Sequence, residues 1–272
     1  MDVGVAQGQA LVGSLGETAV GTSSSSRGPG GRSPLVPSWA DAEPGVPLPQ
    51  PDGQRFRAFR TEFGRYAAGG GGGSLRSALG HYARTATGGQ AYGPRRFGSA
   101  YQAGGSLFGL LGNLAAGGDG AAFAGIDLSG LAGRTLGYAA QEIARALAPE
   151  NGDADRIRIA IQEAIAEVLP DVEIFDPATL TADDIIAIMV EFLTRILFQQ
   201  VVEDAGSAWN KAPSDARTAV AEGELFDLIR IALDRHLGPR LADGGGRLAR
   251  AEVERLQRAA IDDVWRDWET FA

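Results

Sequence analysis

Side chains that could carry out catalysis are scarce in this chain. It contains no cysteine and only two histidines, His81 and His236, which are far apart in the sequence. Without thiolate ligands or paired histidines at helical spacing, the sequence shows no metal site. The lack of cysteine also gives no support for an oxidising compartment. We therefore expect no metal and no other cofactor.

The acidic residues do not form an acid–base pair either. Three adjacent pairs occur, at Asp183 and Asp184, Glu203 and Asp204, and Asp262 and Asp263. Neighbours on a helix point about 100° apart, so none of these pairs can share a proton, and we expect all three to lie on solvated faces. The single lysine, Lys211, does not fit the GxxxxGK[ST] phosphate loop, and no serine lies in G-x-S-x-G. The sequence therefore disfavours an enzyme.

One basic stretch, residues 55 to 66, has interleaved aromatic residues. On a helix, Phe56, Phe59, Phe63 and Tyr66 share one face, and the arginines surround it: Arg55, Arg57, Arg60 and Arg65. Amphipathic burial of the aromatic stripe against an acidic bundle is the favoured interpretation. The alternative is that the arginines contact a nucleic-acid strand, another phosphate-bearing ligand or an acidic partner protein.

Charge is distributed unevenly along the 272 residues. Residues 1 to 100 carry ten arginines and six acids, a balance of +4, whereas residues 101 to 272 carry 15 basic and 28 acidic residues, a balance of −13. An acidic body argues against broad nucleic-acid binding, which requires clustered cations.

The elements that position these residues are expected to be helices. Residues 1–53 are predicted to be a disordered leader and linker, 54–126 short helices with glycine-rich connections, and 127–272 a helical bundle. Helices are predicted at 54–68, 74–86, 128–148, 153–169, from Thr181 onward with a capping box to Asp184, from Ser214 to His236 with a stop at Gly238-Pro239, and at 247–271. No comparable strand alternation exists, so the predicted fold class is all-α.

Nothing in the sequence favours a membrane or secretion. The longest uncharged window, Phe97 to Gly118, is rich in glycine and small polar residues and is predicted to be a buried or loosely helical segment. Residues 1 to 20 lack a basic start followed by an apolar run, as a secretory signal would have. We expect a cytoplasmic protein.

The most informative segment is Gly21 to Trp39. Glycine and serine maximise backbone freedom, and three prolines, Pro29, Pro34 and Pro37, prevent helix or ladder formation. Its apolar residues, Leu35, Val36 and Trp39, are spaced by proline in the manner of a peptide that inserts into a partner's groove. We therefore expect this tail to be presented to a partner and not buried, although a solvated leader with no task has the same composition.

This segment resembles the N-terminal signature of the QatB family, components of bacterial Qat anti-phage defence systems. The resemblance rests on Gly21-Thr22-Ser23-Ser24, on Arg27-Gly28-Pro29-Gly30-Gly31 and on Pro34-Leu35-Val36-Pro37-Ser38-Trp39. It implies a non-enzymatic protein whose N-terminal glycine is modified by a QueC-like partner, QatC, through amide attachment of a deazaguanine. It also implies a defence ATPase and a TatD-like nuclease as further partners. The tail residues implied in partner recognition are Thr22, Ser23, Gly28, Pro29, Pro34, Leu35, Pro37 and Trp39.

In this chain the candidate modification site, Gly21, is internal. Translation from Val20, encoded by GTG and read as methionine, would place Gly21 at the second position. The same start would also match the M-G-x-x-x-[ST] pattern for N-myristoylation, a rival interpretation of the same residues.

Overall fold

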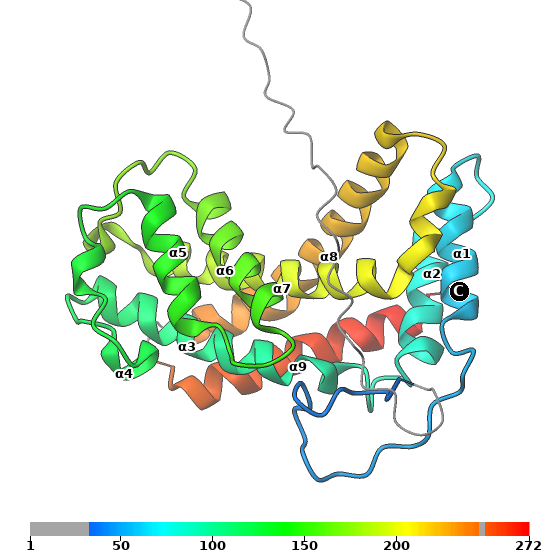
Figure 1. The fold of residues 1–272 in the computed structure, drawn as a ribbon, viewed down its shortest axis with the longest axis horizontal. Coiled ribbons are helices and arrows are strands. Elements are labelled where there is room, and N and C mark those ends of the chain that lie inside the picture. The colour runs from blue at the N-terminus through cyan, green and yellow to red at the C-terminus, as the bar shows by residue number, and fades with distance from the viewer. Residues whose placement is uncertain (1–32, 245–247, 272) are drawn as a thin grey trace, which may run out of the picture. The chain divides into compact units, whose positions relative to one another are not determined.

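A computed structural model describes residues 33–244 and 248–271. The chain divides into two units, Met1–Ser33 and Pro34–Ala272, and the second contains all the helices of the described residues. Its described part contains nine α-helices and no named strand, which confirms the predicted all-α fold (Figure 1). The candidate modification residue Gly21, and Thr22, Ser23, Gly28 and Pro29, lie outside the described residues.

The helices follow one another with short connections. They are α1 (Arg57–Ala68), α2 (Leu75–His81), α3 (Gly98–Ala115), α4 (Ala121–Ala124), α5 (Leu136–Leu147), α6 (Ala154–Val168), α7 (Ala182–Ala205), α8 (Asp215–Asp243) and α9 (Arg250–Glu269). Short 3-10 or π segments join them: η1 (Tyr82–Ala86), η2 (Pro94–Phe97), η3 (Ser129–Leu131), η4 (Pro177–Thr179) and η5 (Gly206–Lys211). One hydrophobic core includes residues from every one of these helices except α4, whose Phe123 and Ala124 pack against it, so the segments 54–126 and 127–272 do not form separate cores.

Two predicted helix starts are confirmed by their caps. The Thr181 hydroxyl accepts from the Asp184 amide at 3.1 Å, and the Asp184 carboxylate accepts from the Thr181 amide at 2.9 Å. Ser214 caps α8 by accepting from the Arg217 amide at 3.2 Å. Each cap satisfies backbone donors that have no partner in the first turn of a helix.

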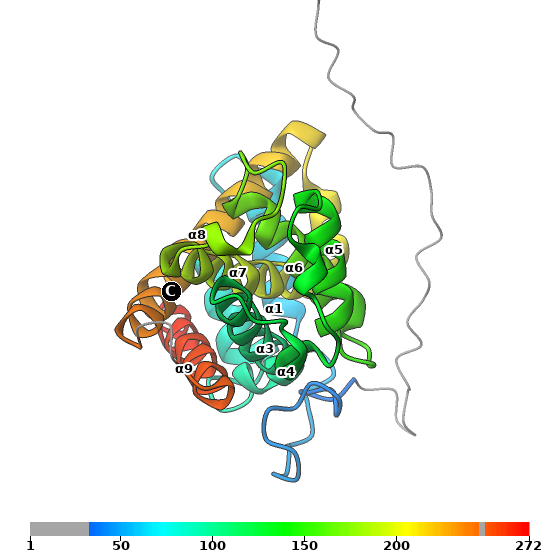
Figure 2. The ribbon, with the colours of Figure 1, turned by 90° about the vertical axis from the view of Figure 1, so that its left-hand side faces the viewer.

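The long apolar helix α7 is the central one. It packs against α6, α8 and α3, and the ribbon shows it between α6 and α8 in two perpendicular views (Figures 1 and 2). The segment Ala182–Lys211 is long and apolar enough to cross a membrane by length and composition alone, and it is the one such helix among the described residues. Because α7 is buried against three helices, its apolar composition is that of a core helix.

The glycine-rich window 97–118 forms α3, and its expected burial is confirmed. It packs along α9. At Gly104 an added Cβ would lie 2.1 Å from the Gln257 side-chain oxygen, so a larger residue would displace the buried Gln257 side chain. The buried Gln257 amide donates to the Tyr101 carbonyl at 3.1 Å across the same contact. The glycines therefore allow close helix packing.

The prediction of a helix from residue 128 is wrong in its first turns. Residues 133 to 136 instead pair with a second extended segment: the Gly133 amide donates to the Phe175 carbonyl at 2.9 Å, and the Phe175 amide donates to the Arg134 carbonyl at 2.8 Å. This pairing competes with helical hydrogen bonds, and α5 begins only after the Thr135 cap.

The predicted stop of the α8 helix at Gly238-Pro239 is also wrong, because the helix continues to Asp243 with Pro239 inside it. Proline removes one backbone donor and crowds the preceding turn. Leu237 and Leu241, on either side of it, are both fully buried. Burial of this apolar face offsets the cost of the proline.

Candidate functional site

The proline-containing segment 34–46 packs on the helical body. Leu35 and Val36 are 5% and 1% exposed, whereas Trp39 is 48% exposed. The prediction that residues 1–53 form an unpacked leader is therefore wrong for this part, and so is the prediction that Leu35 is presented. The reason is that two arginines from the helical body satisfy the polar groups of a segment that has no regular secondary structure.

Arg95, in η2, holds the middle of this segment. The side chain is 1% exposed, and its guanidinium binds both Asp41 carboxylate oxygens, at 2.9 and 2.7 Å. It also donates to the carbonyls of Glu43 and Val46 at 3.0 and 3.1 Å. The hydrogen bonds from Arg95 hold the pKa of the Asp41 carboxyl below its usual value. This bidentate, charge-assisted contact fixes residues 41 to 46.

Backbone contacts complete the attachment of the segment. The Ala42 amide donates to the Arg95 carbonyl at 2.9 Å, and the Gly98 amide donates to the Ala40 carbonyl at 2.7 Å. The Ser99 hydroxyl donates to the Trp39 carbonyl at 3.0 Å. A Cβ at position 98 would lie 2.7 Å from the Ala40 oxygen, so glycine permits this approach. The start of α3 and the segment are thus joined by direct hydrogen bonds.

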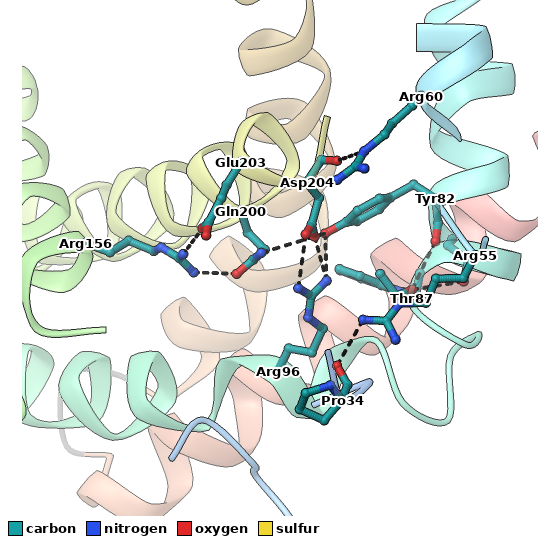
Figure 3. Close-up of polar contacts among 12 residues, drawn as sticks. Pro34, Arg55, Arg60, Tyr82, Thr87, Arg96, Arg156, Gln200, Glu203 and Asp204 are labelled. Atoms are coloured by element: carbon teal, nitrogen blue, oxygen red, sulfur yellow. Dashed lines mark hydrogen bonds and ion pairs between the residues drawn. The ribbon is translucent and has the colours of Figure 1, made fainter. Parts of the chain in front are cut away.

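Arg55, which precedes α1, holds the beginning of the segment. Its guanidinium donates to the Pro34 carbonyl at 3.0 Å, as Figure 3 shows, and the residue is 8% exposed. Burial lowers the pKa of Arg55, and the nearby Arg96 guanidinium lowers it further. Arg55 therefore anchors Pro34 to the helical body.

Next to Arg55 lies a buried polar network centred on Asp204, near the end of α7. The Asp204 carboxylate accepts from Arg96 at 2.7 Å, from the Tyr82 hydroxyl at 2.8 Å and from the Gln200 amide at 3.1 Å (Figure 3). Burial alone would raise the pKa of Asp204, but the Arg96 charge and these three hydrogen bonds outweigh it and hold the pKa below its usual value. Burial raises the pKa of the Tyr82 hydroxyl, so it stays protonated as a donor.

The network reaches several further elements. Arg60 of α1 donates to the Asp204 carbonyl at 2.8 Å, and Arg156 of α6 contacts Gln200 and Glu203. Behind Tyr82, the Thr87 hydroxyl accepts from the Trp265 indole of α9 at 3.0 Å. Hydrogen bonds thus link α1, η1, η2, α6 and α7 around one carboxylate, with α9 attached through Thr87.

This arrangement is suited to holding a segment in place, and it contains no obvious nucleophile. The Asp204 carboxylate is ionised and saturated with donors, so it is not free to act as a base. Among residues 33–244 and 248–271, no group of three or more histidines, cysteines or carboxylates could hold a metal ion. The network therefore links the helices beside Arg55, which holds Pro34.

The structure separates the four predicted arginines into two groups. Arg55 is buried beside the network, whereas Arg57, Arg60 and Arg65 line an open groove together with Lys211, and Arg60 also donates to the Asp204 carbonyl. Three of the four aromatic residues between them, Phe59, Phe63 and Tyr66, are buried as the amphipathic interpretation predicts. Phe56 is partly buried against the core.

Sequence analysis missed Arg95, Arg96 and Asp204. The prediction that the Glu203–Asp204 pair is solvated holds for Glu203 and is wrong for Asp204, which is 9% exposed. A signal was present: Asp204 follows Leu197 and Val201 at helical spacing on the buried face of α7. An acid on an apolar stripe requires a cationic or hydrogen-bonding partner. Its partner Arg96 lies more than a hundred residues earlier in the chain, where no local pattern identifies it.

Comparison with protein families decides the assignment. The family model described as "Qat anti-phage system associated protein QatB" matches residues 88–268, more than half of the chain. The chain belongs to the QatB family. The matched range excludes Gly21 to Trp39, so it is independent of the N-terminal resemblance. No curated protein and no solved structure matches the chain. As a QatB-family protein, the chain is a component of the Qat anti-phage system, and other Qat components are its partners.

Proposed function

We propose that this QatB-family chain is a non-enzymatic, cytoplasmic carrier whose N-terminal segment is modified by a QueC-like partner of the QatC type. The modification is amide attachment of a deazaguanine to the α-amine of Gly21. A defence ATPase and a TatD-like nuclease are the other proposed partners. The chain itself needs no cofactor in this scheme.

The observation that carries the proposal is the attachment of residues 34–46 to the helices. Arg55 and Arg95 hold this segment from both ends, so the chain has a fixed root at Pro34. The residues from Gly21 to Ser33 span at most about 45 Å when fully extended. A fixed root with a tether of limited length suits delivery of a terminal amine into the active site of a partner bound to the helical body.

The chemistry of the amine supports the choice of glycine. An N-terminal α-amine has a pKa near 8, so a substantial fraction is neutral and nucleophilic at cellular pH. Glycine has no Cβ that would hinder entry into a deep site. Gly21 offers this amine only if the cellular chain begins there, as a start at Val20 followed by methionine removal would provide.

Replacing Gly21 by proline tests the proposal. Proline turns the primary amine into a hindered secondary one, and we expect loss of conjugation and of phage resistance with unchanged helix content. Ser25→Pro is the matched control, because it introduces the same residue nearby and leaves the primary amine of Gly21 intact. Full phage resistance in the Gly21→Pro variant would contradict the proposal.

The structure also defines the appropriate truncation. Removing residues 1–53 would delete the packed Leu35, Val36 and Asp41 and so confuse loss of the tail with loss of folding. A chain that begins at Ser33 keeps these contacts. We expect it to unfold at the temperature of the full chain and to give no phage resistance. Resistance in this truncated chain would mean that the helical part acts without the tail.

A further inference from the structure

A basic groove lies between α1 and η5, on the exposed side of α1. It has a volume of about 600 Å³. Four cations line it, together with two hydroxyl groups and three small residues: Arg57, Arg60, Arg65, Lys211, Thr61, Ser207, Gly64, Ala68 and Ala208. The volume is in the range of small-molecule and cofactor sites.

The charge of this groove contrasts with that of the chain. The formal net charge of the protein is −9, yet no acidic residue lines the groove. Most arginines in the described part of the chain form ion pairs with carboxylates, but within those residues Arg57, Arg60 and Lys211 have no carboxylate partner within 4 Å. Arg65 pairs with Glu62 at 3.4 Å. Three cations without a carboxylate partner therefore lie together in this groove.

The groove supplies charge and hydrogen-bond donors but no stacking surface. Phe59 and Phe63 on α1 are fully buried. Phe56 lies between two guanidinium groups, with Arg55 and Arg60 each 5.0 Å from the ring centroid. No aromatic residue in the described part of the chain lines the groove, so a nucleobase would find no aromatic stacking partner there.

We propose that this groove binds several consecutive phosphate groups through their negative charge and does not recognise the base. Guanidinium groups match phosphate oxygens in a bidentate manner, and the Thr61 and Ser207 hydroxyls add neutral donors. From Arg57 to Arg65 the helix rises about 12 Å, which is long enough for more than one phosphate. The source is either a nucleic-acid backbone or the polyphosphate of a nucleotide. This inference does not depend on modification of Gly21.

Binding is measured on the full chain with a short fluorescein-labelled single-stranded DNA, by anisotropy over a range of salt concentrations. Inorganic triphosphate and ATP serve as competitors, and poly-glutamate serves as a carboxylate polyanion. The test variant is Arg57→Glu with Lys211→Glu. The control variant, Arg235→Glu with Arg255→Glu, makes the same change in net charge at exposed helix positions away from the groove.

We expect the groove variant to weaken binding about tenfold or more and to lower the salt slope by about two, while the control stays near the parent protein. Binding of DNA that ATP does not displace supports a nucleic-acid backbone. If the DNA does not bind, triphosphate and ATP are titrated directly by calorimetry, and their binding supports a nucleotide polyphosphate. The proposal is overturned if no phosphate probe binds, if the two variants weaken binding equally, or if poly-glutamate competes as strongly as triphosphate, which would indicate an acidic protein partner.

Discussion

Arg55 and Arg57 are two residues apart and have opposite environments. Arg55 is buried, donates to the Pro34 carbonyl and lies beside the network of Arg96 and Asp204. Arg57 is exposed and lines the groove with Lys211. In the buried network, Asp204 neutralises the charge of Arg96 and the hydrogen bonds link several helices. In the groove, no acidic residue of the described part lines the surface, so its cations are open to a ligand.

The difference shows that the role of an arginine depends on its partner more than on its local sequence. Asp204 of α7 neutralises Arg96 in the network, and Asp41 of the proline-containing segment neutralises Arg95. Both arginines therefore stabilise the fold. In the groove, η5 contributes another cation, Lys211. Substitutions in each region test this division.

Arg96→Ala is expected to be the most damaging change. It leaves the buried Asp204 carboxylate without its charged partner, which costs about 3 to 5 kcal/mol in the free energy of unfolding. Urea denaturation followed by circular dichroism measures the loss. Glu203→Ala is the control, because Glu203 is adjacent to Asp204 but its side chain is 62% exposed, and we expect little change. Equal losses in both variants would contradict the structural role of the network.

Leu35→Ala is expected to have the next largest effect. Leu35 is 5% exposed, and its truncation should lower the free energy of unfolding by about 2 kcal/mol. Faster hydrogen exchange at the amides of Ala42 and Gly98 would show that the loss is local to the docked segment. Trp39→Ala, at a half-exposed position of the same segment, should cost clearly less. A larger loss for Trp39→Ala than for Leu35→Ala would reverse our assignment of the buried and exposed anchors.

Acidification is expected to remove the stability that the buried network contributes and to leave the groove unaffected. The pKa of Asp204 is lower in the folded protein than in the unfolded chain, so its contribution is complete above the unfolded value and is lost as the pH falls through the folded value. We expect the parent protein to lose stability as the pH falls below the usual range of an aspartate, about pH 4, and Asp204→Asn to show a shallower slope there. Identical slopes in denaturation series at several pH values would exclude Asp204 as a contributor.

Arg57→Ala should have the smallest effect on stability. Its guanidinium contacts the Gln54 side chain at 3.3 Å, an exposed hydrogen bond that contributes little. We expect no measurable change in thermal unfolding but weaker binding of the phosphate probe. A large loss of stability would show that Arg57 belongs to the structural group.

Local patterns predicted much of the helical fold. The capping box at Thr181, the cap at Ser214 and the aromatic stripe of α1 all depend on residues close in sequence, and the structure confirms them. The continuation of α8 through Pro239 was not predictable from the local sequence, because it depends on burial of Leu237 and Leu241 against other helices.

The candidate site was less predictable, since its contacts cross large distances in sequence. The docking of Leu35 depends on Arg55 and Arg95, which follow it by 20 and 60 residues. Proline and glycine content correctly indicated a segment with no regular secondary structure. It did not indicate whether that segment is packed, because packing depends on partners that only the folded chain brings together.

The most direct test of the account is the intact mass of the protein expressed from its native operon, with fragmentation to locate any adduct. We predict a chain that begins at Gly21 and carries a deazaguanine on its N-terminal amine, and a chain without that adduct when the QueC-like gene is deleted. An unmodified chain that retains Asp2 to Val20 would contradict the proposal, because the amine of Gly21 would then be part of a peptide bond.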